Sequence, residues 1–348
     1  MKEQNNKEVP IVKLENIDVD FYKGKGLFSK PQTFSALHKI NFTINKGEIV
    51  VVVGESGSGK TTMANVIAGL VKPSGGTFEF NGHEMKSMTK DQEFEYRNSV
   101  QIIQQDSYAA LNPMRTMLKS LGDPMLIKKL ANKNNLRKKV GEVLETVELT
   151  PTDHFIDKYP HQLSGGQRQR TLIARALAMN PRLILADEPV SMIDVSLRVA
   201  ILNLLARLNE ERDIAILYIT HDLATARYVG REGRIAVMYL GSIVETGSVQ
   251  EVLADPKHPY LQALLSAVPI PDPRLSRSRK NRMIQDGDQL SVSDLPTGCR
   301  YHPRCIYCKE ICKTEQPRAR QYGSSMVACH LAEELPEFEL YEKKAENV

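Results

Sequence analysis

Residues 49–62 read Ile-Val-Val-Val-Val-Gly-Glu-Ser-Gly-Ser-Gly-Lys-Thr-Thr. The β-branched run at 49–53 is typical of a buried parallel strand, and the residues after the glycines favour a helix. A glycine-rich turn between strand and helix lets backbone N–H groups face phosphate oxygens, Lys60 contact the phosphates and the Thr61 hydroxyl bind Mg²⁺. The stretch therefore predicts a site for the phosphates of a nucleotide. The residues expected there are Gly54, Ser56, Gly57, Ser58, Gly59, Lys60, Thr61 and Thr62.

Two further strand ends carry polar groups. Residues 183–189 read Leu-Ile-Leu-Ala-Asp-Glu-Pro, an apolar strand that ends in two adjacent carboxylates. We expect Asp187 to hold Mg²⁺ through water and Glu188 to orient the attacking water. His221 ends another apolar strand and can reach a γ-phosphate. Such residues are usually solvated when they stand alone, so the phosphate-binding loop upstream is what favours a catalytic role.

The whole chain has the composition of an ordinary globular protein. It has 348 residues, 46 basic and 42 acidic, with a net charge of +4, which is too small to indicate a nucleic-acid partner. No apolar run approaches the ~20 residues of a membrane span, and the polar N-terminus lacks the apolar region of a secretion signal. We therefore expect a chain that stays in the reducing cytosol and does not cross a membrane.

A second glycine turn opens a helix at residues 163–170, Leu-Ser-Gly-Gly-Gln-Arg-Gln-Arg, and is another potential anion site. In order and approximate spacing, the phosphate-binding loop, this turn, the Asp187-Glu188 strand end and His221 resemble the ATP-binding-cassette (ABC) ATPases. The resemblance implies an α/β ATP-binding-cassette fold of the P-loop NTPase type. Strand and helix patterns agree with a mostly parallel sheet, an antiparallel β element near the N-terminus and an inserted helical subdomain.

The same resemblance implies how ATP is held. Two cassettes dimerise head to tail, and each ATP lies between the phosphate-binding loop of one and the glycine turn of the other. Gln105 is implied to contact Mg²⁺ and the attacking water. Phe21 best matches the aromatic residue that stacks on adenine, with Tyr22 a close competitor and a buried strand aromatic as the alternative. The remaining residues implied to contact nucleotide are Ser164, Gly165, Gly166, Gln167 and Asp194.

Four shorter segments narrow the resemblance to the ATP-binding subunits of oligopeptide/dipeptide importers. They lie at residues 108–113, 188–191, 257–260 and 298–305. The resemblance implies an ATP-hydrolysing subunit that powers peptide import from the cytoplasmic face of the membrane. Its implied partners are a second, different cassette, two membrane permease subunits and, indirectly, an external solute-binding protein. Nickel chelates and oligosaccharides are alternative cargoes within this class.

A non-transport cassette that acts on nucleic acid or the ribosome is the rival hypothesis. The chain lacks the long coiled coils of chromosome-maintenance cassettes, and it lacks the second cassette of the translation-factor type. Both absences disfavour the rival. The expected divisions of the chain are a disordered tail at 1–10, the cassette at 11–270 with its helical subdomain at about 105–165, a linker at 271–297, a cysteine-bearing module at 298–332 and a tail at 333–348.

The cysteines predict a metal site. Cys299, Cys305, Cys312 and Cys329 follow the spacing C-x5-C-x6-C-x16-C, and four thiolates in a reducing compartment suit an iron–sulfur cluster or zinc. Because the pattern resembles one associated with 4Fe-4S clusters in this importer family, we expect such a cluster, with Cys308 left over. Zinc and unliganded structural cysteines are the alternatives.

Overall fold

The computed structural model describes residues 9–23, 32–268 and 295–338. Most of the expected tail at 1–10 and linker at 271–297, and part of the tail at 333–348, lie outside these ranges.

Four strands near the N-terminus form one sheet. They are β1 (Val12–Lys23), β2 (Gln32–Ile44), β4 (Gly75–Phe80) and β5 (His83–Glu84). Their order is β2-β1-β4-β5, and every neighbouring pair is antiparallel. The antiparallel element predicted from the alternating apolar residues is therefore present.

The other strands form an eight-stranded sheet. They are β3 (Ile49–Val53), β6 (Val100–Ile103), β7 (Leu183–Asp187), β8 (Ala215–Thr220), β9 (Arg234–Tyr239), β10 (Ser242–Ser248), β11 (Arg320–Tyr322) and β12 (Ser325–Val327). Their order is β11-β12-β10-β9-β3-β8-β7-β6, and the five strands from β9 to β6 are parallel. The cysteine-bearing extension joins this sheet, because β12 pairs with β10 in antiparallel register.

The helices include the two expected after the phosphate-binding loop and after the second glycine turn, α1 and α7. They are α1 (Lys60–Ile67), α2 (Lys90–Ser99), α3 (Ser107–Ala110), α4 (Met117–Ile127), α5 (Leu136–Thr146), α6 (Asp153–Ile156), α7 (Gly165–Leu177), α8 (Val195–Arg212), α9 (Leu223–Val229), α10 (Val249–Ala254), α11 (Pro259–Ala267) and α13 (Glu310–Thr314). Three 3₁₀ turns are η1 (Met85–Ser87), η2 (Pro160–Gln162) and η3 (His302–Arg304). In the described ranges, no helix has both the length and the apolar character of a membrane span.

The valine run of β3 is buried on both faces, as a central parallel strand requires. Val50 and Val52 pack in the core shared with α1 and the antiparallel sheet. Val51 and Val53 pack in the core shared with α7, α8 and α9. Because successive side chains of a strand point to opposite faces, α1 and α7 cover opposite sides of the sheet.

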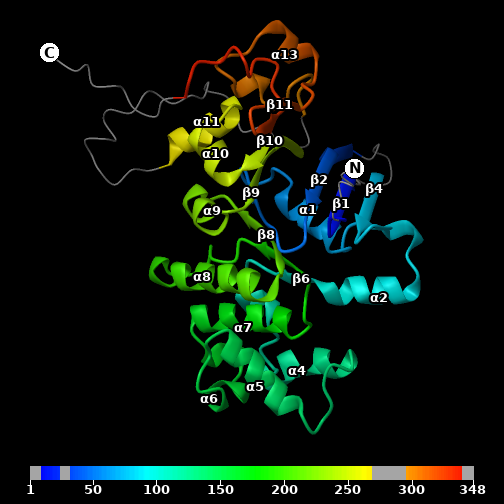
Figure 1. The fold of residues 1–348 in the computed structure, drawn as a ribbon, viewed down its shortest axis with the longest axis vertical. Helices are drawn as coiled ribbons and strands as arrows, with labels where there is room; N and C mark the ends of the chain where they lie inside the picture. The colour runs from blue at the N-terminus through cyan, green and yellow to red at the C-terminus, as the bar shows by residue number, and fades with distance from the viewer. Residues whose placement is uncertain (1–8, 24–31, 269–294, 339–348) are drawn as a thin grey trace, which may run out of the picture.

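Residues 104–182 form helices and turns without a strand between β6 and β7. Val140 and Leu144 are buried one turn apart on α5, as the apolar periodicity predicts. In Figure 1 this helical part, α4 to α7, lies at one end of the long axis, and the extension with β11 and α13 lies at the other. The predicted fold class, a cassette with an inserted helical subdomain, is confirmed.

Candidate functional site

The phosphate-binding loop links β3 to α1 and depends on glycine. Gly57 and Gly59 have φ angles of +79° and +101°, which L side chains rarely adopt. A Cβ atom on Gly59 would lie 2.8 Å from the carbonyl oxygen of Ala36. Gly59 is the N-cap of α1, so the loop delivers the chain directly to a helix N-terminus.

Lys60 is folded back onto the loop. Its Nζ atom donates hydrogen bonds to the carbonyl oxygens of Gly54 (2.7 Å) and Glu55 (2.8 Å). Burial lowers the pKa of Lys60, and the nearby carboxylates of Glu188, Asp187 and Glu55 oppose this shift. The lysine of the loop and the carboxylates of the β7 strand end are therefore brought into one electrostatic site.

The hydroxyl groups of the loop differ in their surroundings. Burial raises the pKa of Asp187, the nearby Thr61 hydroxyl lowers it, and the charge of Glu188 adds a smaller increase. The Ser58 hydroxyl is buried and has no hydrogen-bond partner among the described residues. Ser56 is exposed and Thr62 is half-buried. A hydroxyl beside one carboxylate fits Mg²⁺, which usually takes one or two protein carboxylates, several waters and substrate phosphates.

Glu188 lies between two polar side chains from separate segments. One carboxylate oxygen accepts a 3.0 Å hydrogen bond from the amide nitrogen of Gln105, and the other lies 3.0 Å from Nδ1 of His221. Glu188 has a φ angle of +46°, which is unusual for a residue other than glycine. Such strain often accompanies functional sites because the surrounding structure must hold it in place. The three residues expected to act in catalysis therefore form one cluster.

The glycine turn at the start of α7 is held by a pair of hydrogen bonds between Ser164 and Gln167. The Ser164 hydroxyl accepts a hydrogen bond from the N–H of Gln167 (3.3 Å), and the Gln167 side chain accepts one from the N–H of Ser164 (3.0 Å). This reciprocal pair is a capping box that fixes the helix start. Gly165 and Gly166 follow it in the first turn of α7. The helix that they begin packs on the opposite face of the sheet from α1, which follows the phosphate-binding loop.

Two other residues predicted to contact nucleotide, Asp194 and Phe21, lie on different elements of the fold. Asp194 is exposed at the N-cap of α8. Phe21 is half-buried in β1, with its ring centroid 5.4 Å from that of Phe34. The competing Tyr22 is 71% exposed. An aromatic residue must offer an open ring face to stack on adenine, and this geometry leaves Tyr22 more open than Phe21.

The predicted 4Fe-4S cluster is a point of correction. Although all five cysteines are described, no group of three or more His, Cys, Asp or Glu side chains in the described ranges is arranged to hold a metal ion. Burial raises the pKa of Cys299 and Cys305 to about 12 and that of Cys329 to about 11. The expectation was wrong because spacing alone says nothing about burial or ligand geometry.

Sequence reasoning missed contacts between the loop and the end of the chain. The Glu55 carboxylate is paired with Arg304 of the extension, and the N–H of Glu55 donates to the Tyr260 hydroxyl (2.8 Å). Arg304 and Tyr260 fall inside segments that resemble peptide importers, but no local pattern indicates that they reach the loop.

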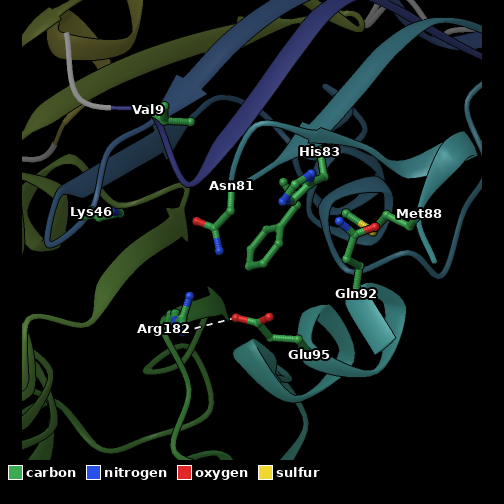
Figure 2. Close-up of a pocket in the computed structure, with 9 residues that line it drawn as sticks. Val9, Lys46, Asn81, His83, Met88, Gln92, Glu95 and Arg182 are labelled. Carbon is green, nitrogen blue, oxygen red and sulfur yellow. Dashed lines mark ion pairs between the residues drawn. The ribbon is translucent and has the colours of Figure 1, made fainter. Parts of the chain in front are cut away.

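A separate polar cavity of about 300 Å³ contains none of the predicted site residues (Figure 2). Lys46 and His83 line it, together with an ion pair between Arg182 and Glu95 (3.1 Å). It lies between the antiparallel sheet, α2 and the start of β7, away from the phosphate-binding loop.

The cassette fold, the phosphate-binding loop and the paired carboxylates at the end of β7 define an ABC-type ATPase, which binds ATP and Mg²⁺. Residues 37–191 match the family described as ABC transporter, and residues 244–312 match the C-terminal region of oligopeptide/dipeptide transporters. The chain belongs to the family of ATP-binding proteins of oligopeptide and dipeptide ABC transporters.

Individual relatives agree with this assignment. The oligopeptide transport ATP-binding protein OppF of Haemophilus influenzae is 40% identical, over 94% of this chain and 99% of its own length. The oligopeptide transport ATP-binding protein AppF of Bacillus subtilis is 39% identical, over 92% and 97% of the two chains. Among solved structures, the dimeric post-hydrolysis state of the ATP-binding cassette MJ0796 with ADP and Pi has a TM-score of 0.59 and 33% identity, covering 68% of this chain and 98% of that one.

Proposed function

We propose that this protein hydrolyses ATP to power the import of peptides through partner membrane subunits. The observation that carries the ATPase chemistry is the Glu188 carboxylate held between Gln105 and His221 beside the phosphate-binding loop. The names of the relatives, which are peptide transport ATP-binding proteins, support peptides as the cargo.

In this proposal the loop residues and Lys60 bind the β- and γ-phosphates, and Thr61, Asp187 and Gln105 hold Mg²⁺. Bound Mg²⁺ neutralises charge that develops on the phosphates. Glu188 orients the attacking water and accepts its proton, while His221 contacts the γ-phosphate. The open ring of Tyr22 makes it, with Phe21, a candidate for stacking on adenine.

The second half of the nucleotide site comes from another cassette. Ser164, Gly165, Gly166 and Gln167 begin a helix that packs on the opposite sheet face from α1, which supports a site in which a head-to-tail partner supplies this turn. The solved relative MJ0796 is described as dimeric, which supports such an arrangement. We propose a heterodimer in which Asp194 lies near the shared nucleotide. It would bind two permease subunits from the cytoplasmic face of the membrane and act indirectly with an external solute-binding protein.

The test is capture of the tagged full chain from detergent-solubilised membranes of its host, followed by transport in proteoliposomes. We expect two permease subunits and a second cassette to be captured, and ATP to drive uptake of a labelled tripeptide. Glu188→Gln in the same complex should remove uptake but leave the complex intact. Capture of ribosomes or nucleic acid in place of permeases would overturn the transport proposal. Uptake of a nickel chelate or an oligosaccharide but not a peptide would overturn the cargo.

A further inference from the structure

Glu55, within the phosphate-binding loop, is held by three other residues. Its N–H donates to the Tyr260 hydroxyl (2.8 Å), and its carbonyl oxygen accepts from Lys60 Nζ (2.8 Å). Its carboxylate accepts two hydrogen bonds from the Arg304 guanidinium, at 2.8 and 3.0 Å. The loop is therefore tied both to its own lysine and to the C-terminal part of the chain.

The side chain of Arg304 is largely buried and lies near two tyrosine rings. It ends the turn η3, and its side chain is only 9% exposed. Its guanidinium carbon lies 5.9 Å from the ring centroids of both Tyr239 and Tyr301. Two parallel hydrogen bonds to one carboxylate fix both direction and distance. The Glu55 side chain is 29% exposed, so the pair is partly buried, and removal of one partner leaves a charge that solvent screens only in part.

The extension also reaches the other end of the loop. The Arg300 guanidinium donates to the carbonyl oxygen of Leu240. The next residue, Gly241, donates its N–H to the carbonyl oxygen of Ser58 (2.9 Å). Gly241 has a φ angle of +77°, and a Cβ atom there would lie 2.6 Å from the carbonyl oxygen of Ala36. The extension thus contacts the loop directly at Glu55 and through this turn at Ser58.

The charge of Glu55 bears on nucleotide binding. Its carboxylate is close enough to Lys60 to act on that cation, which is the group expected to contact the phosphates. An unpaired carboxylate at this position would repel a triphosphate. The Arg304 pair cancels that charge, while the hydrogen bond from Glu55 N–H to Tyr260 holds the backbone of the loop.

We propose that Arg304 is a positioning residue that neutralises Glu55 and thereby makes the C-terminal extension part of the ATP site. The proposal rests on the proposed phosphate-binding role of the loop. It assigns the extension a direct effect on ATP affinity, exerted through one ion pair that joins residues 249 positions apart.

The test measures the dissociation constant of Mg·ATP for the full chain. Arg304→Gln should raise this constant about tenfold, because the Glu55 charge is then unpaired. Adding Glu55→Gln to Arg304→Gln should restore the constant to within about twofold of the wild-type value, because no charge is left to repel the phosphates. Arg304→Lys, which keeps the charge but not the two-bond geometry, should fall between wild type and Arg304→Gln. Arg320→Ala, at an exposed arginine in β11 of the same extension, is the matched control and should bind as wild type.

The outcomes separate this inference from the proposed function. Wild-type protein that does not bind Mg·ATP would refute the proposed function itself. Wild-type affinity in Arg304→Gln would overturn the inference, and so would equally weak binding in the Glu55→Gln/Arg304→Gln double variant, because a purely structural defect is not repaired by removing the second charge. If Arg304→Gln does not fold, the double variant and Arg304→Lys decide: binding about tenfold weaker than wild type in both would overturn the role of charge.

Discussion

The side-chain amide of Gln105 donates a 3.0 Å hydrogen bond to the carboxylate of Glu188, which joins the end of β6 to the end of β7. Gln105 begins the helical part of the chain, and Glu188 is the expected general base. A movement of the helical part can therefore reach the reacting water through a single contact. Three of the four predictions below concern this site.

Glu188→Gln should lower ATP turnover at least about 100-fold, because the amide keeps the shape of the side chain but cannot accept the developing proton of the water. ATP binding should persist, since Lys60 and the loop remain. Steady-state hydrolysis and equilibrium binding on the same preparation check both parts. Turnover above about a tenth of the wild-type rate would show that Glu188 is not the base.

Gln105→Ala should affect the assembled transporter more than the isolated chain. Removal of the amide breaks the contact between Glu188 and the helical part, so stimulation of hydrolysis by transported substrate should be lost. Hydrolysis is compared with and without the membrane subunits. An equal loss in both settings would leave Gln105 with a role in binding Mg²⁺ alone.

Lys60→Ala should weaken ATP binding roughly 10- to 100-fold, because a charged group that hydrogen-bonds to the phosphates is removed. The lysine is already buried against the loop carbonyls of Gly54 and Glu55, so it is placed to exchange those partners for phosphate oxygens. Calorimetric titration with Mg·ATP measures the change. Lys72→Ala, at an exposed position after α1, is the control, and equal affinity in the two variants would contradict the role of Lys60.

Glu245 should make stability depend on pH. It is fully buried in β10, where its carboxylate accepts the backbone N–H groups of Lys257 (3.0 Å) and His258 (2.8 Å). Burial raises its pKa from 4.5 to about 7. Between these values the folded state keeps a proton that the unfolded state releases, so the free energy of unfolding falls as pH rises, by about 3 kcal/mol in total. Burial lowers the pKa of His258 from 6.5 to about 3, so His258 is neutral in the folded state and gains a proton only on unfolding below about pH 6.5. This raises stability as pH rises and opposes the Glu245 contribution there, equally in wild type and in a Glu245 variant.

Glu245→Gln should remove the contribution of Glu245 and leave that of His258. Urea unfolding of wild type and variant at about pH 5 and about pH 8 measures it, with Glu251→Gln on the exposed face of α10 as control. The variant should lose less stability than wild type as pH rises. Identical slopes for wild type and Glu245→Gln would show that Glu245 does not titrate in this range.

Much of the nucleotide site could be predicted because its signals are local. The valine run, the glycines and Lys60 are adjacent in sequence, and each has a conformational or charge requirement that can be recognised without the fold. The strand ends at Glu188 and His221 are also local, and parallel strands place such ends at one edge of a sheet. Their 3.0 Å contact follows from that arrangement, but its geometry depends on the packed sheet.

The cysteines and the C-terminal contacts show where local patterns fail. Spacing suggested a metal cluster, but a metal site needs ligands that converge in space, and no such group is found among the described residues. Whether Phe21 or Tyr22 presents an open ring depends on which side of β1 is covered, and Phe34 covers Phe21. The arrangement of the cysteines and the exposure of an aromatic ring both depend on how distant segments pack around these side chains.

The sequence by itself predicted the phosphate-binding loop and the polar strand ends, because glycine conformation, strand periodicity and residue chemistry act over a few neighbouring positions. The class of the protein followed from the resemblance of these motifs, in their order, to a known family. The tertiary structure alone decided that β12 joins the main sheet and that Arg304 pairs with Glu55. No local sequence pattern indicates an ion pair between residues so far apart in the chain. It forms only because the fold brings a buried cation and a loop carboxylate together, where each is costly to leave unpaired.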